Sequence, residues 1–420
     1  MFNLSFNFFK NIKNFIFPFY KSKDLKFIFE KLQEGTPGDK VVARFVGGCV
    51  RKHLSNEKVD DIDIATILTT DQVKEKFKDT NLKVIDTGVK HGTVTIVSEN
   101  HKVELTTLRK DIKTDGRHAE VEYTDNWQQD SERRDFTINA IYMDINGKIY
   151  DPQMGTVDLK NRNIKFIGDP QKRIEEDYLR IVRFIRFKIM YNILVEPTTS
   201  DAIKQNLVGI QKISKERILI ELFKILSLKN FLTINQSSIL MEIFSMIFPE
   251  LLYLSRLERL KKIYQYSEEN VDILLAVMLI DEKDNHEYFI YKYNTSNKIK
   301  ANLEKFNKNL IKIKNDREFF EKNLIKNVYL NGKNHLIALN LINFSINSKV
   351  KIKDFNKTLN KILKIKVPVF PIDGETLKQK GMLEGQMLGD VLKTLEKEWI
   401  NNNFKISNER VEEIIKINSN

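Results

Sequence analysis

Two aspartates, Asp61 and Asp63, follow a pair of adjacent glycines, Gly47 and Gly48, near the start of the chain. Apolar and acidic residues alternate over 59–65, which predicts a strand with both carboxylates on one face. Neighbouring carboxylates repel unless a cation lies between them, and such hard oxygen ligands suit Mg²⁺ bound with a nucleotide phosphate. The glycines let the backbone approach a phosphate closely. The combination predicts metal-dependent nucleotidyl transfer.

A third carboxylate, Glu104, lies in an alternating stretch at 103–109 that is typical of a strand. Glu104 is placed where it could join the two aspartates as a catalytic residue, although an exposed strand glutamate is the simpler interpretation of this residue taken alone. The polar segment 109–119 that follows contains a glycine and mixed charges. We predict a mobile loop beside the site, with a flexible surface connection as the alternative.

Arg133, Arg134 and Asp135 stand directly before an apolar stretch at 138–144 that we predict to be a strand. An arginine can hold triphosphate oxygens with its forked guanidinium group. Asp135 can accept a hydrogen bond from a ribose hydroxyl, and Asn139 can orient it. The cluster is therefore a candidate nucleotide-binding element, and a salt-bridged strand entry is the alternative.

The stretch 175–186 has helical periodicity and many charges. Glu176 and Arg180 are four residues apart, a spacing that favours an ion pair on a helix, and Asp177 precedes Arg180 by one turn. Arginines at three-residue steps fan out around a helix, an arrangement suited to phosphates. They are Arg180, Arg183 and Arg186. An ion-paired surface helix is the alternative.

The elements that must position these residues form two kinds of region. Between about 38 and 166, short β-type runs alternate with short helical ones, which indicates an α/β head. The expected strands are 41–46, 62–65, 93–97, 103–108 and 138–144, and the expected helix is 70–77. From about 170 onward helical periodicity dominates. The helical region 286–366 is rich in Lys and Asn, and a Pro- and Gly-marked segment opens a C-terminal module at about 367.

The chain has 420 residues and a formal net charge of +12, so several domains and a polyanionic partner such as nucleic acid are expected. A compositional bias toward Lys, Asn and Ile is the alternative source of the charge. The single cysteine, Cys49, excludes an intramolecular disulfide and favours a reducing compartment. The longest clean apolar run, 273–280, is too short to span a bilayer. We expect a cytoplasmic protein without a membrane partner, and a short helix at 1–20 packed on the head.

Taken in order, these motifs resemble the class II tRNA nucleotidyltransferases, the CCA-adding enzymes, which share a head with bacterial poly(A) polymerases. The resemblance is strong from about 41 to 225 and weaker in the tail, at 370–377 and 381–385, whereas 235–365 matches no motif. The matching segments are Gly47–Arg51, Asp61–Asp63, Asp115–Ala119, Arg133–Ala140, Glu176–Arg180 and Ser214–Ile218.

The resemblance implies an α+β fold, in which a nucleotidyltransferase-type mixed α/β head is followed by an all-α neck, body and tail. It also implies Mg²⁺-dependent, template-independent addition of C, C and A from CTP and ATP to the 3′ end of tRNA, with release of pyrophosphate. The oligomeric state stays open. The expected division is an N-terminal extension at 1–37, the catalytic head at 38–166, a base-reading neck at 167–230, an RNA-binding body at 231–366 and a tRNA-binding tail at 367–420.

By the same resemblance, Asp61 and Asp63 hold Mg²⁺ and a larger set binds the incoming nucleotide. Asp177 and Arg180 read the base, while the loop Asp115–Ala119 resembles the one that helps the switch from C to A. The implied nucleotide-binding set is Gly47, Gly48, Arg51, Arg134, Asp135, Asn139, Asp177, Arg180, Arg183 and Arg186.

One residue departs from the family pattern, because Lys52 stands where an acid usually follows the arginine of the glycine motif. This substitution leaves the local hydrogen bonding open. A poly(A) polymerase is the main alternative function, but that subgroup usually carries an arginine pair soon after the metal aspartates, and 86–94 has none. A partial enzyme that adds only CC or only A also stays open. Intact Asp61, Asp63 and Arg134 argue against a non-catalytic RNA-binding protein.

Overall fold

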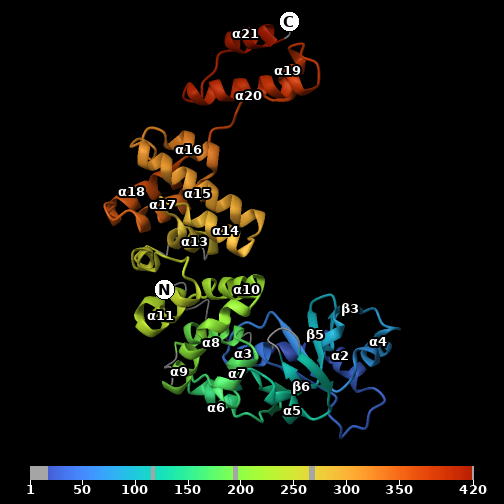
Figure 1. Cartoon of the computed structure of the whole chain (residues 1–420). Coiled ribbons are helices and arrows are strands. Elements are labelled where there is room, and N and C mark those ends of the chain that lie inside the picture. Colours follow the sequence, from blue (N-terminus) through green and yellow to red (C-terminus); the bar gives the residue numbers. More distant parts are fainter. Residues whose placement is uncertain (1–17, 115–118, 193–196, 264–269, 419–420) are drawn as a thin grey trace. The chain divides into compact units, whose positions relative to one another are not determined.

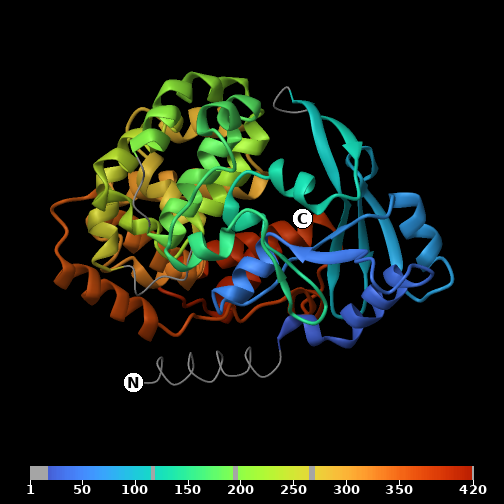
Figure 2. The same ribbon diagram turned by 90° about the horizontal axis from the view of Figure 1, so that it is seen from below.

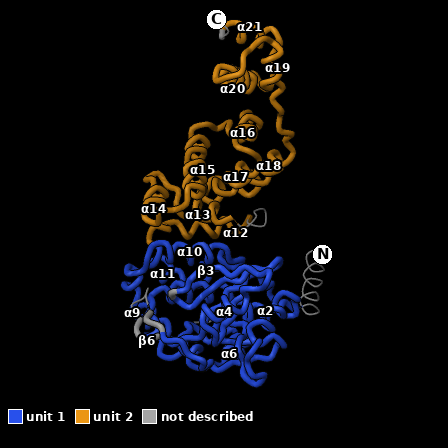
Figure 3. Tube along the Cα trace, turned by 90° about the vertical axis from the view of Figure 1, so that its right-hand side faces the viewer, with its two compact units in different colours: residues 1–248 blue, residues 249–420 orange. Residues whose placement is uncertain are grey.

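The computed structural model of the chain describes residues 18–114, 119–192, 197–263 and 270–418. They form two compact units that divide between Phe248 and Pro249 (Figures 1 and 3). The first unit combines a mixed β-sheet with helices, and the described part of the second is helical, in agreement with the predicted α+β class. None of the described helices is long and apolar enough to cross a bilayer.

The first unit is built on a seven-stranded sheet in the order β3-β4-β5-β2-β1-β8-β9, whose strands lie side by side in Figure 2. Within this sheet β2 pairs in parallel with β5, and the other neighbouring strands are antiparallel. A separate hairpin joins β6 and β7. The strands are β1 (Ala43–Val46), β2 (Ile62–Thr66), β3 (Lys83–Gly88), β4 (Thr93–Val97), β5 (Lys102–Thr107), β6 (Arg109–Thr114), β7 (Ala119–Tyr123), β8 (Tyr142–Met143) and β9 (Ile149–Tyr150).

Three helices of the head pack against this sheet: α2 (Lys23–Gln33), α3 (Gly48–Leu54) and α4 (Thr70–Phe77). They share one hydrophobic core with the strands, as with Leu25 of α2 and Phe45 of β1, both fully buried. The bounds of α4 match the predicted helix. It begins with a capping box between Thr69 and Gln72, which satisfies two backbone donors at the helix start.

Helix α2 lies inside the predicted N-terminal extension, yet its apolar face belongs to the head core. Most of the helix predicted for 1–20 lies outside the described residues, which begin at Pro18 with a 3₁₀ turn at Phe19–Lys21. The five-part domain division therefore stays a prediction, beside the observed division into two units.

The first unit has further helices, some of which line the polar cluster described below. Of these, α8 is largely buried and contacts α10. The helices are α5 (Trp127–Glu132), α6 (Gly155–Lys160), α7 (Pro170–Glu176), α8 (Leu179–Tyr191), α9 (Pro197–Asn206), α10 (Lys215–Leu226) and α11 (Ser238–Ile247).

The second unit is built around α13 and α17, both of which contact α12 and α15. Its last three helices, α19 to α21, form a hydrophobic cluster of their own. The helices are α12 (Leu257–Lys261), α13 (Val271–Leu279), α14 (Asn285–Tyr293), α15 (Asn297–Asn315), α16 (Leu324–Asn331), α17 (Lys333–Ile346), α18 (Ile352–Lys364), α19 (Gly374–Gln379), α20 (Gln386–Asn401) and α21 (Asn408–Asn418).

Two predicted elements in the first unit are wrong. The apolar stretch 138–144 is not one strand: Thr137–Asn139 forms a 3₁₀ turn, and β8 has only two residues. Its side chains are apolar because they are buried, which a core turn requires as much as a strand does. The segment 109–119 is not simply a loop, since its two ends form β6 and β7. The tip, residues 115–118, lies outside the described residues.

The single helix predicted for 175–186 is also wrong, because the structure has two helices there. α7 ends at Glu176, Asp177 is extended with φ −155°, and α8 begins at Leu179. An Oδ1 atom of Asp177 accepts the backbone N–H of Leu179 at 3.1 Å. Aspartate competes in this way for backbone donors that a continuous helix would use, so helical periodicity concealed a break.

Candidate active site

A cleft of about 1070 Å³ opens in the first unit. Its walls come from α3, the start of β2, the segment after α5, and the helices α7, α8 and α10. Of the predicted site residues, only Glu104 is absent from its lining. The predicted residues that line it are Gly47, Gly48, Arg51, Asp61, Asp63, Arg134, Asp135, Asn139, Asp177, Arg180, Arg183 and Arg186.

Two of the predicted carboxylates, Asp61 and Asp63, line the cleft, and Glu104 lies next to Asp63. Asp63 on β2 lies directly opposite Glu104 on β5 in the parallel register. Burial raises the pKa of Asp63 to about 6, and the charges of Glu104 and Asp61 add to this, against the opposing effect of Arg134 and Arg51. Concentrated negative charge of this kind, with oxygen ligands only, fits a hard divalent cation such as Mg²⁺.

Glu104 itself is exposed and lies outside the cleft lining. It therefore contributes negative charge beside Asp63, and its catalytic role stays a prediction. Asp61 precedes β2, and 89% of its side chain is exposed. The strand predicted over 59–65 thus contains Asp63 but not Asp61, although both aspartates line the cleft, with very different access to solvent.

The glycine turn faces the same cleft. Gly47 has φ +70°, a backbone conformation that glycine adopts without steric cost. A Cβ at Gly47 would lie 3.7 Å from the carbonyl oxygen of Asn139, and one at Gly48 would lie 3.9 Å from a carboxylate oxygen of Asp63. The turn thus brings backbone close to the carboxylates and opens α3.

Arg51 of α3 is buried, and its contacts are with two elements far from it in sequence, the 3₁₀ turn Thr137–Asn139 and helix α8. Its Nη1 donates to Oδ1 of Asn139, and its Nε donates to the hydroxyl of Tyr191 at 2.9 Å. The guanidinium also lies over the ring of Phe187, 4.8 Å from the centroid. Tyr191 and Phe187, on α8, are residues that sequence reasoning missed, because nothing local marks them as partners of Arg51.

Lys52 follows Arg51 in the cleft wall. Its Nζ donates to Oδ1 of Asp60, and the same ammonium lies 4.0 Å from Oδ2 of Asp61. The hydrogen bond from Lys52 lowers the pKa of Asp60. The lysine that departs from the family pattern is therefore held beside the predicted metal site by an aspartate that the sequence analysis had not selected.

Asp130 organises the arginine side of the cleft and was also missed. Its side chain is 1% exposed and pairs with Arg133 at 2.7 Å and Arg134 at 3.0 Å. It also accepts the hydroxyl of Tyr142 at 2.7 Å. Burial alone would raise the pKa of Asp130, but the two arginines hold it well below its usual range. The spacing of three and four residues on α5 is the signal that could have identified it.

Asp135 is paired as well. It lies 2.7 Å from Arg183 of α8 and accepts the side-chain amide of Asn139 at 2.9 Å. Burial opposes its charge, yet Arg183 and these hydrogen bonds lower the pKa of Asp135 to about 2. The predicted ribose acceptor thus already bridges the head segment and α8.

The break between α7 and α8 places a second set of ion pairs at the cleft. Arg180 donates to Glu176 at 2.6 Å, as the sequence predicted, and Asp177 pairs with Arg217 of α10 at 2.7 Å. Arg186 has Nε 2.9 Å from Oε2 of Glu221, although the two atoms are not aligned for a hydrogen bond. Burial lowers the pKa of Arg186 to about 10.

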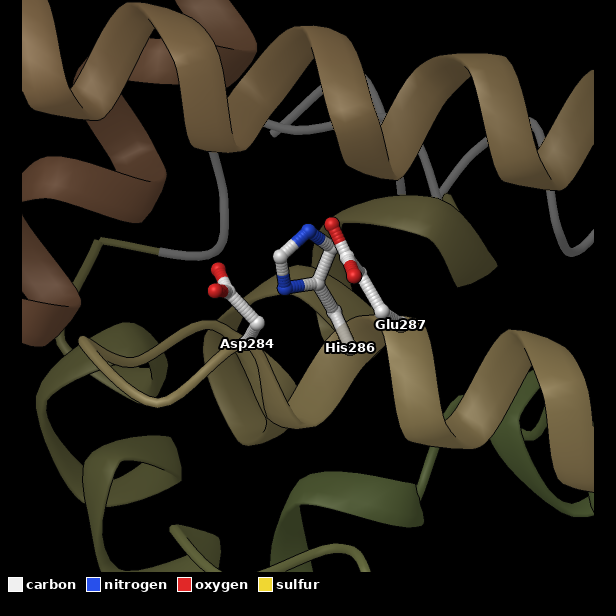
Figure 4. Close-up of side chains that lie close together, drawn as sticks. All are labelled: Asp284, His286 and Glu287. Carbon is white, nitrogen blue, oxygen red and sulfur yellow. The ribbon is translucent and has the colours of Figure 1, made fainter.

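A second group of possible metal ligands lies at the start of α14 in the other unit (Figure 4). Asp284, His286 and Glu287 offer ligand atoms within 4.8 Å of one another. The His286 ring is buried between the two carboxylates, which are exposed. The positive end of the α14 dipole opposes a cation there, so we assign no metal site to this group.

Two family profiles match the chain. The profile described as "Poly A polymerase head domain" matches residues 43–165, and the one described as "Probable RNA and SrmB- binding site of polymerase A" matches residues 192–254. The first contains the glycine turn, both aspartates and the paired arginines of the cleft.

Two relatives match over most of their length. CCA tRNA nucleotidyltransferase 1, mitochondrial, of Danio rerio is 32% identical over 393 residues, which covers 88% of this chain and 85% of the relative. The CCA-adding enzyme of Ligilactobacillus salivarius is 32% identical over 393 residues, covering 90% of this chain and 92% of the relative. The human CCA tRNA nucleotidyltransferase 1, mitochondrial, is 46% identical over 190 residues, or 44% of this chain and 43% of the relative.

Solved structures share the fold. The Bacillus stearothermophilus CCA-adding enzyme in complex with CTP has a TM-score of 0.64 at 23% identity, covering 93% of this chain and 96% of that chain. The Thermotoga maritima CCA-adding enzyme complexed with tRNA has a TM-score of 0.61 at 23% identity, covering 94% and 96%. Because two full-length relatives exceed 30% identity, the chain belongs to the family of CCA tRNA nucleotidyltransferases, the CCA-adding enzymes.

Proposed function

We propose that the cleft adds C, C and A in sequence to the 3′ end of tRNA from CTP and ATP, and that Asp61 and Asp63 hold the Mg²⁺ required. The observation that carries the proposal is that one cleft is lined both by the carboxylates of Asp61 and Asp63 and by several guanidinium groups. A nucleoside triphosphate needs both a divalent cation and basic groups, because its phosphates carry several negative charges.

The metal assignment is supported by the position of Asp63 opposite Glu104 on neighbouring strands and by its raised pKa, which reflects burial first and the charges of Glu104 and Asp61 second. When bound, Mg²⁺ would supply Lewis-acid chemistry at the attacking tRNA 3′-hydroxyl and at the departing pyrophosphate. Asp61 is exposed enough to reach an ion shared with substrate, whereas Asp63 is fixed in β2. Asp63 would thus anchor the ion, whereas Asp61 would accommodate the position of the ion when it is shared with substrate.

The phosphates are proposed to bind between the glycine turn and the arginines. The backbone of Gly48 can approach a phosphate closely because it has no side chain, and Arg51 and Arg134 provide forked donors. The Nη2 and Nε groups of Arg134 donate hydrogen bonds to Asp130. The guanidinium is therefore oriented before substrate binds. Such pre-orientation lowers the entropic cost of binding.

The base is proposed to be read by Asp177 and Arg180. Cytosine and adenine both present an amino donor beside a ring-nitrogen acceptor, whereas uracil and guanine present the reverse. A carboxylate only accepts and a guanidinium only donates, so Asp177 and Arg180 together fit the first pair of bases. Asp177 has Oδ2 on Arg217 and Oδ1 on the Leu179 amide, but a carboxylate has about four acceptor sites and retains capacity for a base.

The partner is proposed to be tRNA. The lysine-rich helices of the second unit would contact its phosphates, and the release of counterions from those phosphates would favour binding. A cytoplasmic location is proposed from the single cysteine, which favours a reducing compartment. One relative carries "mitochondrial" in its name. Imaging of the tagged full-length protein would test the location, and organelle localisation would overturn it.

Purified protein incubated with tRNA lacking its 3′ CCA, labelled CTP and labelled ATP tests the activity by product length on a gel. Three added nucleotides are expected. A product that stops after CC would instead establish a CC-adding enzyme. Addition of A only to tRNA that already ends in CC would establish an A-adding enzyme, and a long A tail would establish a poly(A) polymerase.

The same gel tests the metal residues. Asp61→Asn and Asp63→Asn should each reduce turnover on the order of a thousandfold or more, since metal-assisted charge stabilisation is worth several kcal/mol. Asp86→Asn is the matched control, because Asp86 is a head aspartate paired with Lys74 outside the cleft lining. Near-parental turnover in either cleft variant would remove that residue from the metal site.

A further inference from the structure

The Lys52–Asp60 pair lies at the rim of the proposed metal site. Lys52 comes from α3 and Asp60 from the segment before β2, and both line the cleft beside Asp61. The lysine side chain is 23% exposed, so it is largely held in the wall, whereas that of Asp60 is 57% exposed. The ammonium hydrogen bonds to Asp60 and stands 4.0 Å from the Asp61 carboxylate.

A fixed ammonium at this distance competes with a metal ion for Asp61. Like charges repel through a distance of about 4 Å even in water, so Lys52 weakens binding of a divalent cation. Asp60 acts in the opposite sense, because its negative charge attracts the cation and, through the hydrogen bond, offsets part of the charge of Lys52.

We propose that the Lys52–Asp60 pair sets the metal affinity of the Asp61–Asp63 site and keeps it low until a nucleotide is present. Mg²⁺ in such sites usually takes one or two carboxylates and completes its shell with substrate phosphates. A site weakened by Lys52 therefore holds the ion firmly only when the triphosphate adds its own oxygens and negative charge. Lys52 and Asp60 are positioning residues, and they need not contact the reacting atoms.

The inference rests on the proposed function, since it takes Asp61 and Asp63 as the metal ligands. It makes two opposite predictions for single substitutions. Lys52→Met removes the competing charge and leaves Asp60 negative, so the free enzyme should bind a divalent cation more tightly. Asp60→Asn removes one negative charge and leaves the charge of Lys52 without its compensating carboxylate, so binding should weaken. The double variant removes both charges, so its affinity should lie above that of the parent, because Lys52 is gone, and below that of Lys52→Met, because the attraction of Asp60 is gone as well.

The test measures Mn²⁺ binding to the full-length protein without nucleotide, by calorimetry or by the electron paramagnetic resonance signal of free Mn²⁺. We expect a shift on the order of fivefold in each direction. Lys52→Arg keeps the charge and should match the parent. Lys74→Met is the matched control, because Lys74 is also ion-paired, with Asp86 at 2.8 Å, and lies outside the cleft lining.

The variant Asp61→Asn with Asp63→Asn defines the baseline, because Mn²⁺ that it still binds belongs elsewhere. If this variant binds as the parent does, the metal assignment itself fails, and the inference fails with it. If it loses the site but Lys52→Met and Asp60→Asn shift affinity in the same direction or not at all, the inference alone is overturned. Circular dichroism and thermal unfolding of each variant distinguish a lost fold from a lost site.

Discussion

The two sides of the cleft carry opposite charges, and they differ in how far neighbouring residues of the protein compensate those charges. On the sheet side, Asp63 lies beside Glu104, and its raised pKa reports a net cost of holding the charge there. On the helical side, Arg133 and Arg134 share the buried Asp130, and Arg183 pairs with Asp135. Asp63 has like charges as neighbours, whereas these arginines have protein carboxylates as partners.

This difference indicates how each side would meet substrate. A cation on the carboxylate side relieves repulsion, so its binding is favoured by the fold itself. A triphosphate on the arginine side must share guanidinium donors that already serve Asp130 and Asp135. Each guanidinium has five N–H donors, so sharing is possible without breaking the pairs. The ion pairs with Asp130 and Asp135 keep the arginines oriented. Because these carboxylates also offset the positive charge, the net attraction for phosphate is weaker.

The largest effect is expected from breaking the paired side. Asp130→Asn removes the charge shared by two arginines in a nearly fully buried position, and breaking such a pair costs about 3 kcal/mol. Urea denaturation should show this loss, and CTP affinity should fall because Arg134 is no longer held.

Asp125→Asn is the control for that experiment, since Asp125 is 70% exposed and pairs loosely with Lys40 at 3.4 Å. Exposed pairs are worth roughly 0–1 kcal/mol. If Asp130→Asn destabilises the protein no more than Asp125→Asn does, the idea that Asp130 organises the arginine side is wrong.

A smaller effect is expected at the base-reading pair. Asp177→Ala should weaken discrimination against UTP and GTP by about tenfold to a hundredfold, because an unpaired buried polar group costs roughly 1–3 kcal/mol. Competition among the four nucleotides measures the change. Asp201→Ala on α9 serves as the control, as an exposed aspartate outside the cleft lining. Unchanged rejection of UTP by Asp177→Ala would mean that the base is read by other residues.

Removing a charge on the carboxylate side should stabilise the folded protein, whereas removing Asp130 on the arginine side should destabilise it. Asp63→Asn, although inactive, should stabilise the metal-free protein at pH 7 by about 3 kcal/mol, since the pKa is raised by about two units and each unit is worth about 1.4 kcal/mol. The folded pKa of about 6 exceeds the ordinary value of 3.8. The penalty in the parent is therefore fully present above pH 6 and disappears as the pH falls below 3.8.

Urea denaturation in buffer containing a chelator, at several pH values between 7 and 4, measures this difference. The advantage of Asp63→Asn should shrink steadily as the pH falls, and added Mg²⁺ should stabilise the parent alone. A variant that is less stable than the parent at pH 7, or a gap that does not change with pH, would contradict the account of the carboxylate side.

The smallest effect is expected from fully solvated charges in the second unit. Lys305 and Lys312 are exposed on α15, seven residues apart and so on one side of the helix. Their joint replacement by Gln should reduce the salt dependence of tRNA binding by a slope of about 1 to 2, because each phosphate contact releases a counterion. Lys83→Gln on β3 is the control. Equal slopes for both proteins would place the tRNA contacts elsewhere.

Local sequence patterns predicted much of the cleft. The alternation around Asp61 and Asp63 defines a strand edge, and the apolar periodicity with its cap defines α4, because both depend on neighbours in the chain. The same reasoning failed at Asp177, where a side chain bonds to the backbone two residues on and ends the helix. It also failed at 138–144, since burial makes a core turn as apolar as a strand.

The sequence by itself determined which residue types can bind metal, phosphate and base, and their order along the chain, because these follow from chemistry and short spacing. Only the tertiary structure decided which partners the charged residues find far along the chain. Arg183 meets Asp135 across 48 residues, Arg217 meets Asp177 across 40, and Arg51 meets Tyr191 across 140. Such partners are chosen by how helices pack on the sheet, and the charge compensation that distinguishes the two sides of the cleft arises from that packing.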